Sequence, residues 1–96
     1  MPLYVTLMKY TPEAMKNIHE VPERFQQNRQ IVEANGGKVI GFYALMGAWD
    51  LLAITEFPDE KRAMSALVTI GKTGRLTTQT MTAIAGEDFI ALAKNA

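Results

Sequence analysis

The stretch KVIGFYALMGAWDLLAITEF, residues 38–57, decides the fold, because two apolar runs meet in it at Gly47 and Ala48. A glycine between two runs rich in β-branched and aromatic residues is typical of a β-hairpin, and we expect its strands at about residues 39–46 and 49–57. Both runs are almost continuous in apolar residues. This pattern predicts that both faces of the hairpin are buried.

A strand with two different faces is predicted at residues 3–10, which alternate with a period of two. One face is aliphatic and consists of Leu3, Val5 and Leu7. The other face is aromatic and mixed, and consists of Tyr4, Thr6, Met8 and Tyr10. We expect helices to cover the aliphatic face and a partner or a ligand to meet the mixed face.

Helix signals lie between the predicted strands. Thr11 and Pro12 begin a helix that should end near residue 18, and Pro22 breaks it and begins a second piece. Two glycines, at positions 36 and 37, end that piece. Asp59 is a suitable N-cap for the next helix. A short terminal helix should dock through Phe89, Leu92 and Ala93.

A threonine-rich strand at residues 76–84 completes the order strand, helix, strand, strand, helix, strand, helix. This order predicts one α+β domain over residues 1–96, with the ferredoxin-like βαββαβ fold, a four-stranded antiparallel sheet and an added C-terminal helix. Helices cover only one face of such a sheet. We therefore predict a homodimer in which two sheets stack face to face, with a cavity or a dry core between them.

The composition excludes several classes of function. Ten basic and ten acidic residues cancel, and neither sign forms a run, so nothing favours nucleic acid binding. The chain has no cysteine, which excludes disulfides and thiolate metal sites. Its longest uncharged run, residues 39–49, is too short to span a bilayer. We expect a cytoplasmic protein that does not enter a membrane.

The common catalytic and metal signatures fail. Gly71, Lys72 and Thr73 resemble the end of a phosphate-binding loop, but the first glycine of that motif is missing. Pro22 interrupts the helix that would align His19 with a second metal ligand. The single serine, Ser65, has no nucleophile-elbow glycines around it. We expect no metal and no cofactor.

Trp49 and Asp50 form the most unusual pair, because a large aromatic and a carboxylate open a strand that otherwise consists of Leu, Ala and Ile. Asp50 can accept backbone N–H groups at the hairpin turn while Trp49 packs at the end of the sheet. Alternatively, the pair lines the mouth of a pocket, where the carboxylate binds a cation or takes a proton.

The other candidate site residues are few. His19 is the only imidazole and therefore a candidate acid or base, although its position suits the end of a helix. Tyr4, Tyr10 and Tyr43 suit sheet packing or a ligand-lined cavity. We expect Lys9, Arg24 and Arg75 to be solvated, and any of them could bind an anion.

Four segments resemble the GYD-domain family, and together they span nearly the whole chain: YVTLMKYTPE at residues 4–13, GGKV at 36–39, GAWD at 47–50 and TMTAI at 80–84. The family is named for a glycine, tyrosine, aspartate signature, and here Trp49 replaces the tyrosine. The resemblance implies a small bacterial or archaeal protein with a dimeric α/β-barrel fold. Relatives of that fold include cofactor-free monooxygenases, lactone isomerases, haem-dependent enzymes and ligand-sensing domains, so the fold alone does not assign an activity.

Three functions follow as hypotheses. The first is a dimeric domain that binds a small molecule between its two sheets, through Tyr4, Thr6, Met8, Tyr43, Trp49 and Asp50. The second is a cofactor-independent monooxygenase or isomerase that uses His19 or Asp50 as a base. The third is a structural assembly module with a large apolar interface and no ligand.

Overall fold

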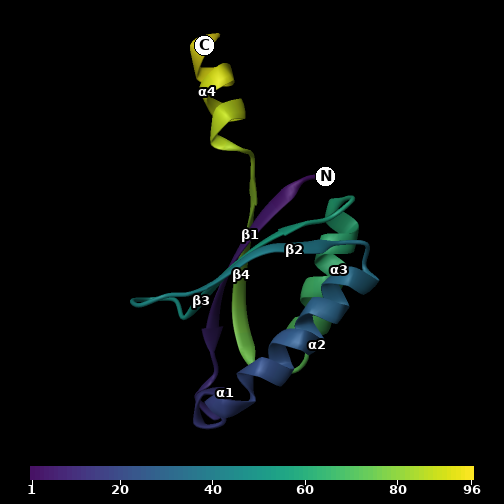
Figure 1. The fold of residues 1–96 in the computed structure, drawn as a ribbon, viewed down its shortest axis with the longest axis vertical. Helices are drawn as coiled ribbons and strands as arrows, with labels where there is room; N and C mark the ends of the chain where they lie inside the picture. Colours follow the sequence, from purple (N-terminus) through teal and green to yellow (C-terminus); the bar gives the residue numbers. More distant parts are fainter.

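Four antiparallel strands form one sheet in the order β2-β3-β1-β4 (Figure 1). The computed structural model describes residues 1–96. The strands are β1 (Leu3–Tyr10), β2 (Lys38–Ala44), β3 (Leu51–Glu56) and β4 (Leu76–Ala83). The helices are α1 (Pro12–Lys16), α2 (Val21–Ala34), α3 (Glu60–Gly71) and α4 (Gly86–Lys94), with a 3-10 turn, η1 (Ile18–Glu20), before α2. The predicted α+β ferredoxin-like fold is confirmed. None of the helices is long and apolar enough to cross a membrane.

The predicted helix signals act as expected. Thr11 caps α1 by accepting a hydrogen bond from the Ala14 N–H at 3.3 Å, and Asp59 caps α3 by accepting one from the Arg62 N–H at 2.9 Å. Proline at position 22 lies in the first turn of α2, where backbone N–H groups have no partner within the helix, so its missing N–H costs no hydrogen bond. Gly36 follows α2 with a φ of 77°, a left-handed backbone conformation that residues with a Cβ atom rarely adopt.

The two faces of β1 are the reverse of the prediction. Tyr4, Thr6 and Met8 are buried beneath α2 and α3, whereas the aliphatic residues of β1 lie on the other face and are only half-buried. The expectation that helices cover the aliphatic face was therefore wrong. Alternation establishes two faces, but it does not say which of them meets the helices.

Small residues of α3 leave room for one large side chain of the buried face. The side of α3 that meets the sheet presents the buried Ala63 and Ala66 beside Leu67 and Ile70, and the two alanines leave space for a ring from the sheet. Tyr4 supplies this ring, which packs edge-on against Phe57 at 5.8 Å between centroids. Thr6 and Thr80 satisfy each other through a 2.8 Å hydrogen bond between their hydroxyl groups, so the hydroxyls cost little in this layer.

The opposite face of the sheet, which we call the open face, is covered by no helix (Figure 1). Strand register places its apolar side chains together: Leu3, Val5, Leu7, Tyr43, Leu52, Ile54 and Met81. The prediction that the hairpin is buried on both faces does not hold within one chain, because β2 is mostly exposed. The same register also places Lys9, Glu56, Thr77 and Gln79 on this face, beside the apolar residues. An uncovered apolar patch within a sheet is uncommon in a monomer.

Helix α4 does not dock as predicted. It extends from the end of β4 away from the sheet and the other helices (Figure 1), and all nine of its residues are exposed. Phe89 and Leu92 are 61% and 64% exposed. The prediction that these two residues and Ala93 hold the helix against its own chain was therefore wrong.

Candidate functional site

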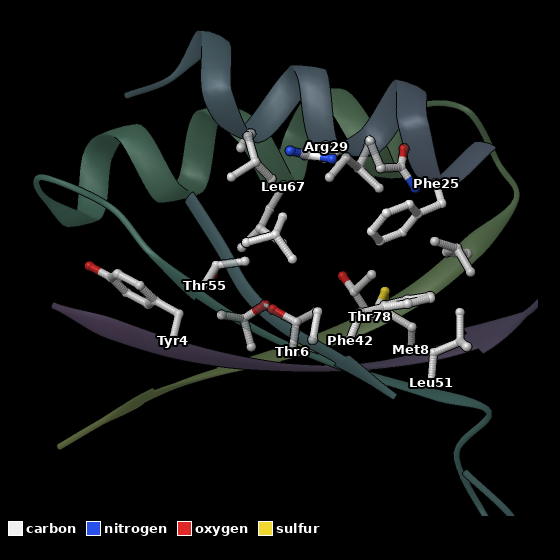
Figure 2. A pocket seen from close by; sticks show the side chains of 18 of the residues that line it. Tyr4, Thr6, Met8, Phe25, Arg29, Phe42, Leu51, Thr55, Leu67 and Thr78 are labelled. Carbon is white, nitrogen blue, oxygen red and sulfur yellow. Dashed lines mark hydrogen bonds between the residues drawn. The ribbon is translucent and has the colours of Figure 1, made fainter. Parts of the chain in front are cut away.

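A cleft of about 90 Å³ lies between the sheet and helices α2 and α3. Figure 2 shows its floor, where Thr6, Met8 and Thr78 project from the sheet toward the helices, and its roof, where Phe25 and Leu67 project downward. The Phe25 ring lies 4.6 Å from that of Phe42, centroid to centroid. The lining is predominantly apolar, which is the usual character of a site for a small organic molecule.

Arg24 is the buried charged group of this cleft and is only 8% exposed. Its Nη1 donates to the Ala14 carbonyl at 3.2 Å, and its Nη2 donates to Glu20 Oε1 at 3.0 Å. The third donor, Nε–H, is buried and has no partner. A buried donor without an acceptor costs free energy, so this atom would gain from an added acceptor.

A polar recess of about 260 Å³ adjoins the cleft where β1 ends and β4 begins. The Thr11 N–H donates to the Arg75 carbonyl at 3.1 Å and closes the sheet there. Arg24 and Arg75 line both the recess and the cleft, while Glu13 and Glu20 line the recess alone. An elongated molecule could therefore lie with an apolar part in the cleft and a polar end at the two arginines.

The structure separates the predicted ligand-binding residues into two groups. Tyr4, Thr6 and Met8 line the cleft, on the side of the sheet opposite to the one expected. Figure 2 shows the Tyr4 hydroxyl directed away from the other labelled residues, and this hydroxyl is buried without a partner. The remaining predicted residues, Tyr43, Trp49 and Asp50, do not line the cleft.

The Asp50 carbonyl accepts a hydrogen bond from the Leu45 N–H at 2.8 Å within the hairpin, whereas the Asp50 carboxylate binds a backbone group outside it. Its Oδ2 accepts a hydrogen bond from the Tyr10 N–H at 2.9 Å, and its own N–H donates to the Met8 carbonyl at 2.9 Å. Asp50 thereby ties the hairpin loop to the end of β1. Burial raises the pKa of the Tyr10 phenol, the Asp50 carboxylate raises it further, and Arg24 opposes the shift.

His19 is exposed in η1 and lines neither the cleft nor the recess. No three His, Cys, Asp or Glu side chains come together in a way that could hold a metal ion. His19 and Asp50 therefore lie apart from the cavity that could hold an organic molecule.

The prediction that Arg24 is solvated was wrong, because its side chain is buried. A signal for its burial does exist: Arg24 follows Val21 by three residues and precedes Asn28 by four, so it shares the inward stripe of α2. Glu20, four residues earlier, forms an ion pair with Arg24 at 3.0 Å and so offsets part of the free-energy cost of burying the guanidinium charge.

A model of the GYD domain family matches residues 4–93 of the chain. A protein of Thermus thermophilus, named "Glutamine synthetase and cystathionine beta-lyase binding protein", is 28% identical over 95 residues, and the match covers 98% of this chain and 100% of that protein. Among solved structures, the crystal structure of FFRP-DM1 superposes with a TM-score of 0.61 at 21% identity, covering 88% of this chain and 100% of that one. At that identity, the structural likeness supports the fold alone.

Proposed function

This chain belongs to the GYD domain family, and on that premise we propose that it is a self-associating module that binds other proteins. The observation that carries this proposal is the open face. Its central side chains, Val5, Leu7 and Leu52, are aliphatic and only half-buried, and no element of the chain covers them. Covering such side chains with a second copy removes apolar surface from water, at about 25 cal/mol per Å².

The size of the open face limits how the dimer can form. Four strands about 4.8 Å apart, with up to eight residues of about 3.3 Å each, give a flat area of roughly 500 Å². A stable interface buries about 800 Å² of accessible surface on each partner. We therefore include α4 in the interface, because its exposed Phe89, Ile90 and Leu92 supply further apolar area directly beyond β4.

The second part of the proposal, binding to other proteins, rests on the Thermus relative. That relative is named for binding two enzymes, glutamine synthetase and cystathionine beta-lyase, and its whole length aligns with this chain. We extend the general role, binding to an enzyme surface, to the present chain. Mixing this protein with the glutamine synthetase of its own source should give a joint peak in size-exclusion chromatography, and separate elution of the two would contradict this part.

The hypothesis of a small molecule between two stacked sheets stays a prediction, with a changed lining. Tyr4, Thr6 and Met8 face the helices, so the residues next to such a ligand would be those of the open face. The central side chains of this face are aliphatic, which favours a dry interface over a polar binding site.

Two matched substitutions, each of a methionine by lysine, test self-association. Met81 lies on the open face, whereas Met64 projects from α3, and both side chains are accessible, at 40% and 62%. We expect Met81→Lys to shift the mass measured by light scattering from two chains to one, because two facing lysines would be desolvated in the dimer. Met64→Lys should leave the dimer intact. If both variants keep the mass of the native protein, the open face is not the interface.

A further inference from the structure

The lining of the internal cleft has an unusual charge balance. Three arginines border it, Arg24, Arg29 and Arg75, and no aspartate or glutamate does. Arg29 lies 3.7 Å from Glu33 in an exposed pair, and Arg75 Nη2 donates only to the neutral Gln27 at 3.3 Å. Arg24 is paired with Glu20 at 3.0 Å, so Arg75 is the arginine of this lining without a carboxylate partner, and its charge favours a negatively charged occupant.

The apolar part of the cleft sets the rest of the ligand's chemistry. Met8, Phe25, Phe42 and Leu51 surround it, and Figure 2 shows these side chains grouped at one end. A volume of about 90 Å³ is several times the roughly 10–15 Å³ that one water molecule requires, so a short hydrocarbon chain or a single ring fits. Filling this space with carbon also restores the packing contacts that the lining side chains lack.

We propose that this cleft is a binding site for a small aliphatic or aromatic monocarboxylate. The apolar body lies among Met8, Phe25 and Leu51, and the carboxylate accepts a hydrogen bond from the unpaired Nε–H of Arg24, with Arg75 beside it. This site is separate from the open face and independent of the proposed self-association, because the two lie on opposite sides of the sheet.

The unpaired donor and the apolar lining limit the charge of the ligand. Nη1 and Nη2 of Arg24 already bind Ala14 and Glu20, and Nε is the buried guanidinium nitrogen without any partner. One such donor, together with Arg75 at the recess, matches a single carboxylate. A phosphate dianion would bring a second charge into a mostly apolar cleft, and its desolvation would oppose binding.

Two methionines provide matched reporters for the test. Met8 lines the cleft, whereas Met81 lies on the open face. The experiment is a titration of the native protein, labelled with ¹³C at the methionine methyl groups, with hexanoate and, separately, with hexan-1-ol. We expect hexanoate to shift the Met8 methyl signal in a saturable way and to leave Met81 unchanged. Hexan-1-ol should bind at least about tenfold more weakly, because it lacks the charge that strengthens the hydrogen bond to Arg24.

A variant tests the role of the arginine directly. Arg24→Met keeps most of the length of the side chain and removes its donors, and we expect the Kd for hexanoate to rise about tenfold while that for hexan-1-ol stays within about twofold. The comparison of acid with alcohol on the native protein decides the question even if this variant does not fold. Equal affinity for both probes, a shift of Met81 instead of Met8, or no shift at millimolar hexanoate would each overturn the proposal.

Discussion

Asp50 Oδ2 accepts a hydrogen bond from the backbone N–H of Tyr10 at 2.9 Å, across 40 residues of sequence. The Asp50 N–H donates in turn to the Met8 carbonyl at 2.9 Å. These two bonds join the loop of the β2–β3 hairpin to the last residues of β1. The carboxylate of the GAWD segment therefore stabilises the fold of the chain and does not border the cleft.

Replacing Asp50 with asparagine should lower the free energy of unfolding by about 1 kcal/mol, because a neutral amide oxygen accepts the Tyr10 N–H more weakly than a carboxylate. Urea unfolding followed by circular dichroism measures this difference. The matched control is Glu33→Gln, which alters only an exposed pair at 3.7 Å and should change stability by less than about 0.5 kcal/mol. Equal stability of the Asp50→Asn variant and the native protein would contradict the claim that the Asp50 carboxylate stabilises the fold.

Stability should fall at alkaline pH because of Tyr4. Burial, then Glu60, then Asp59 raise the pKa of its phenol above the ordinary value of 10.0. Since the folded protein disfavours the phenolate, the stabilisation is complete below pH 10 and is lost as the pH rises through the higher pKa of the folded state. Unfolding measured at pH 8 and at pH 11 should show this loss in the native protein.

The Tyr4→Phe variant should lose less stability between pH 8 and pH 11 than the native protein, because it has no phenol at this position to ionise. At pH 8 it should be as stable as the native protein or more stable, because the substitution deletes a buried hydroxyl without a partner. The native protein, measured at the same two pH values, is the control. A Tyr4→Phe protein that loses as much stability between pH 8 and pH 11 as the control would contradict the assignment.

Gly37→Ala should destabilise the protein by roughly 1–3 kcal/mol, the usual cost of overpacking. An added Cβ would lie 2.6 Å from the ring of Phe57 and 2.8 Å from the Glu56 carbonyl oxygen, and neither can move without disturbing the sheet. At Gly71 a Cβ would meet nothing within 4 Å, so Gly71→Ala serves as the control and should not destabilise the fold. Thermal unfolding compares the two, and an undisturbed Gly37→Ala protein would show that β2 and β3 are packed differently.

Helix α4 should contribute to association and not to the folding of one chain. We expect the double substitution Phe89→Ser and Leu92→Ser to raise the dimer dissociation constant at least about tenfold, because both substitutions remove exposed apolar area that a second copy would cover in the proposed dimer. Sedimentation equilibrium gives this constant, and circular dichroism should report an intact sheet. An unchanged constant would exclude α4 from the interface.

The sequence predicted the order of elements well, because the signals that set it are local. Thr11, Pro22 and Asp59 begin helices through their own hydrogen bonds or ring geometry, and these do not depend on the rest of the fold. The likeness of four segments to one family identified the same family that the match over residues 4–93 shows.

The assignment of faces and of the cleft needed the structure. Tyr4 packs in one buried cluster with the small side chains Ala63 and Ala66 of a helix more than fifty residues away, and alternation along β1 carries no information about that helix. The hydrogen bond from Tyr10 to Asp50 likewise depends on strand pairing between β1 and β3. Both are tertiary relationships, which overrule local preference.

The mass of the native protein in solution tests the central proposal most directly. Sedimentation equilibrium over a range of micromolar concentrations should give twice the 10.6 kDa of one chain, because in the proposed dimer a second copy covers the open face and α4 together. A mass of one chain that stays constant up to the highest concentration would contradict self-association through the open face.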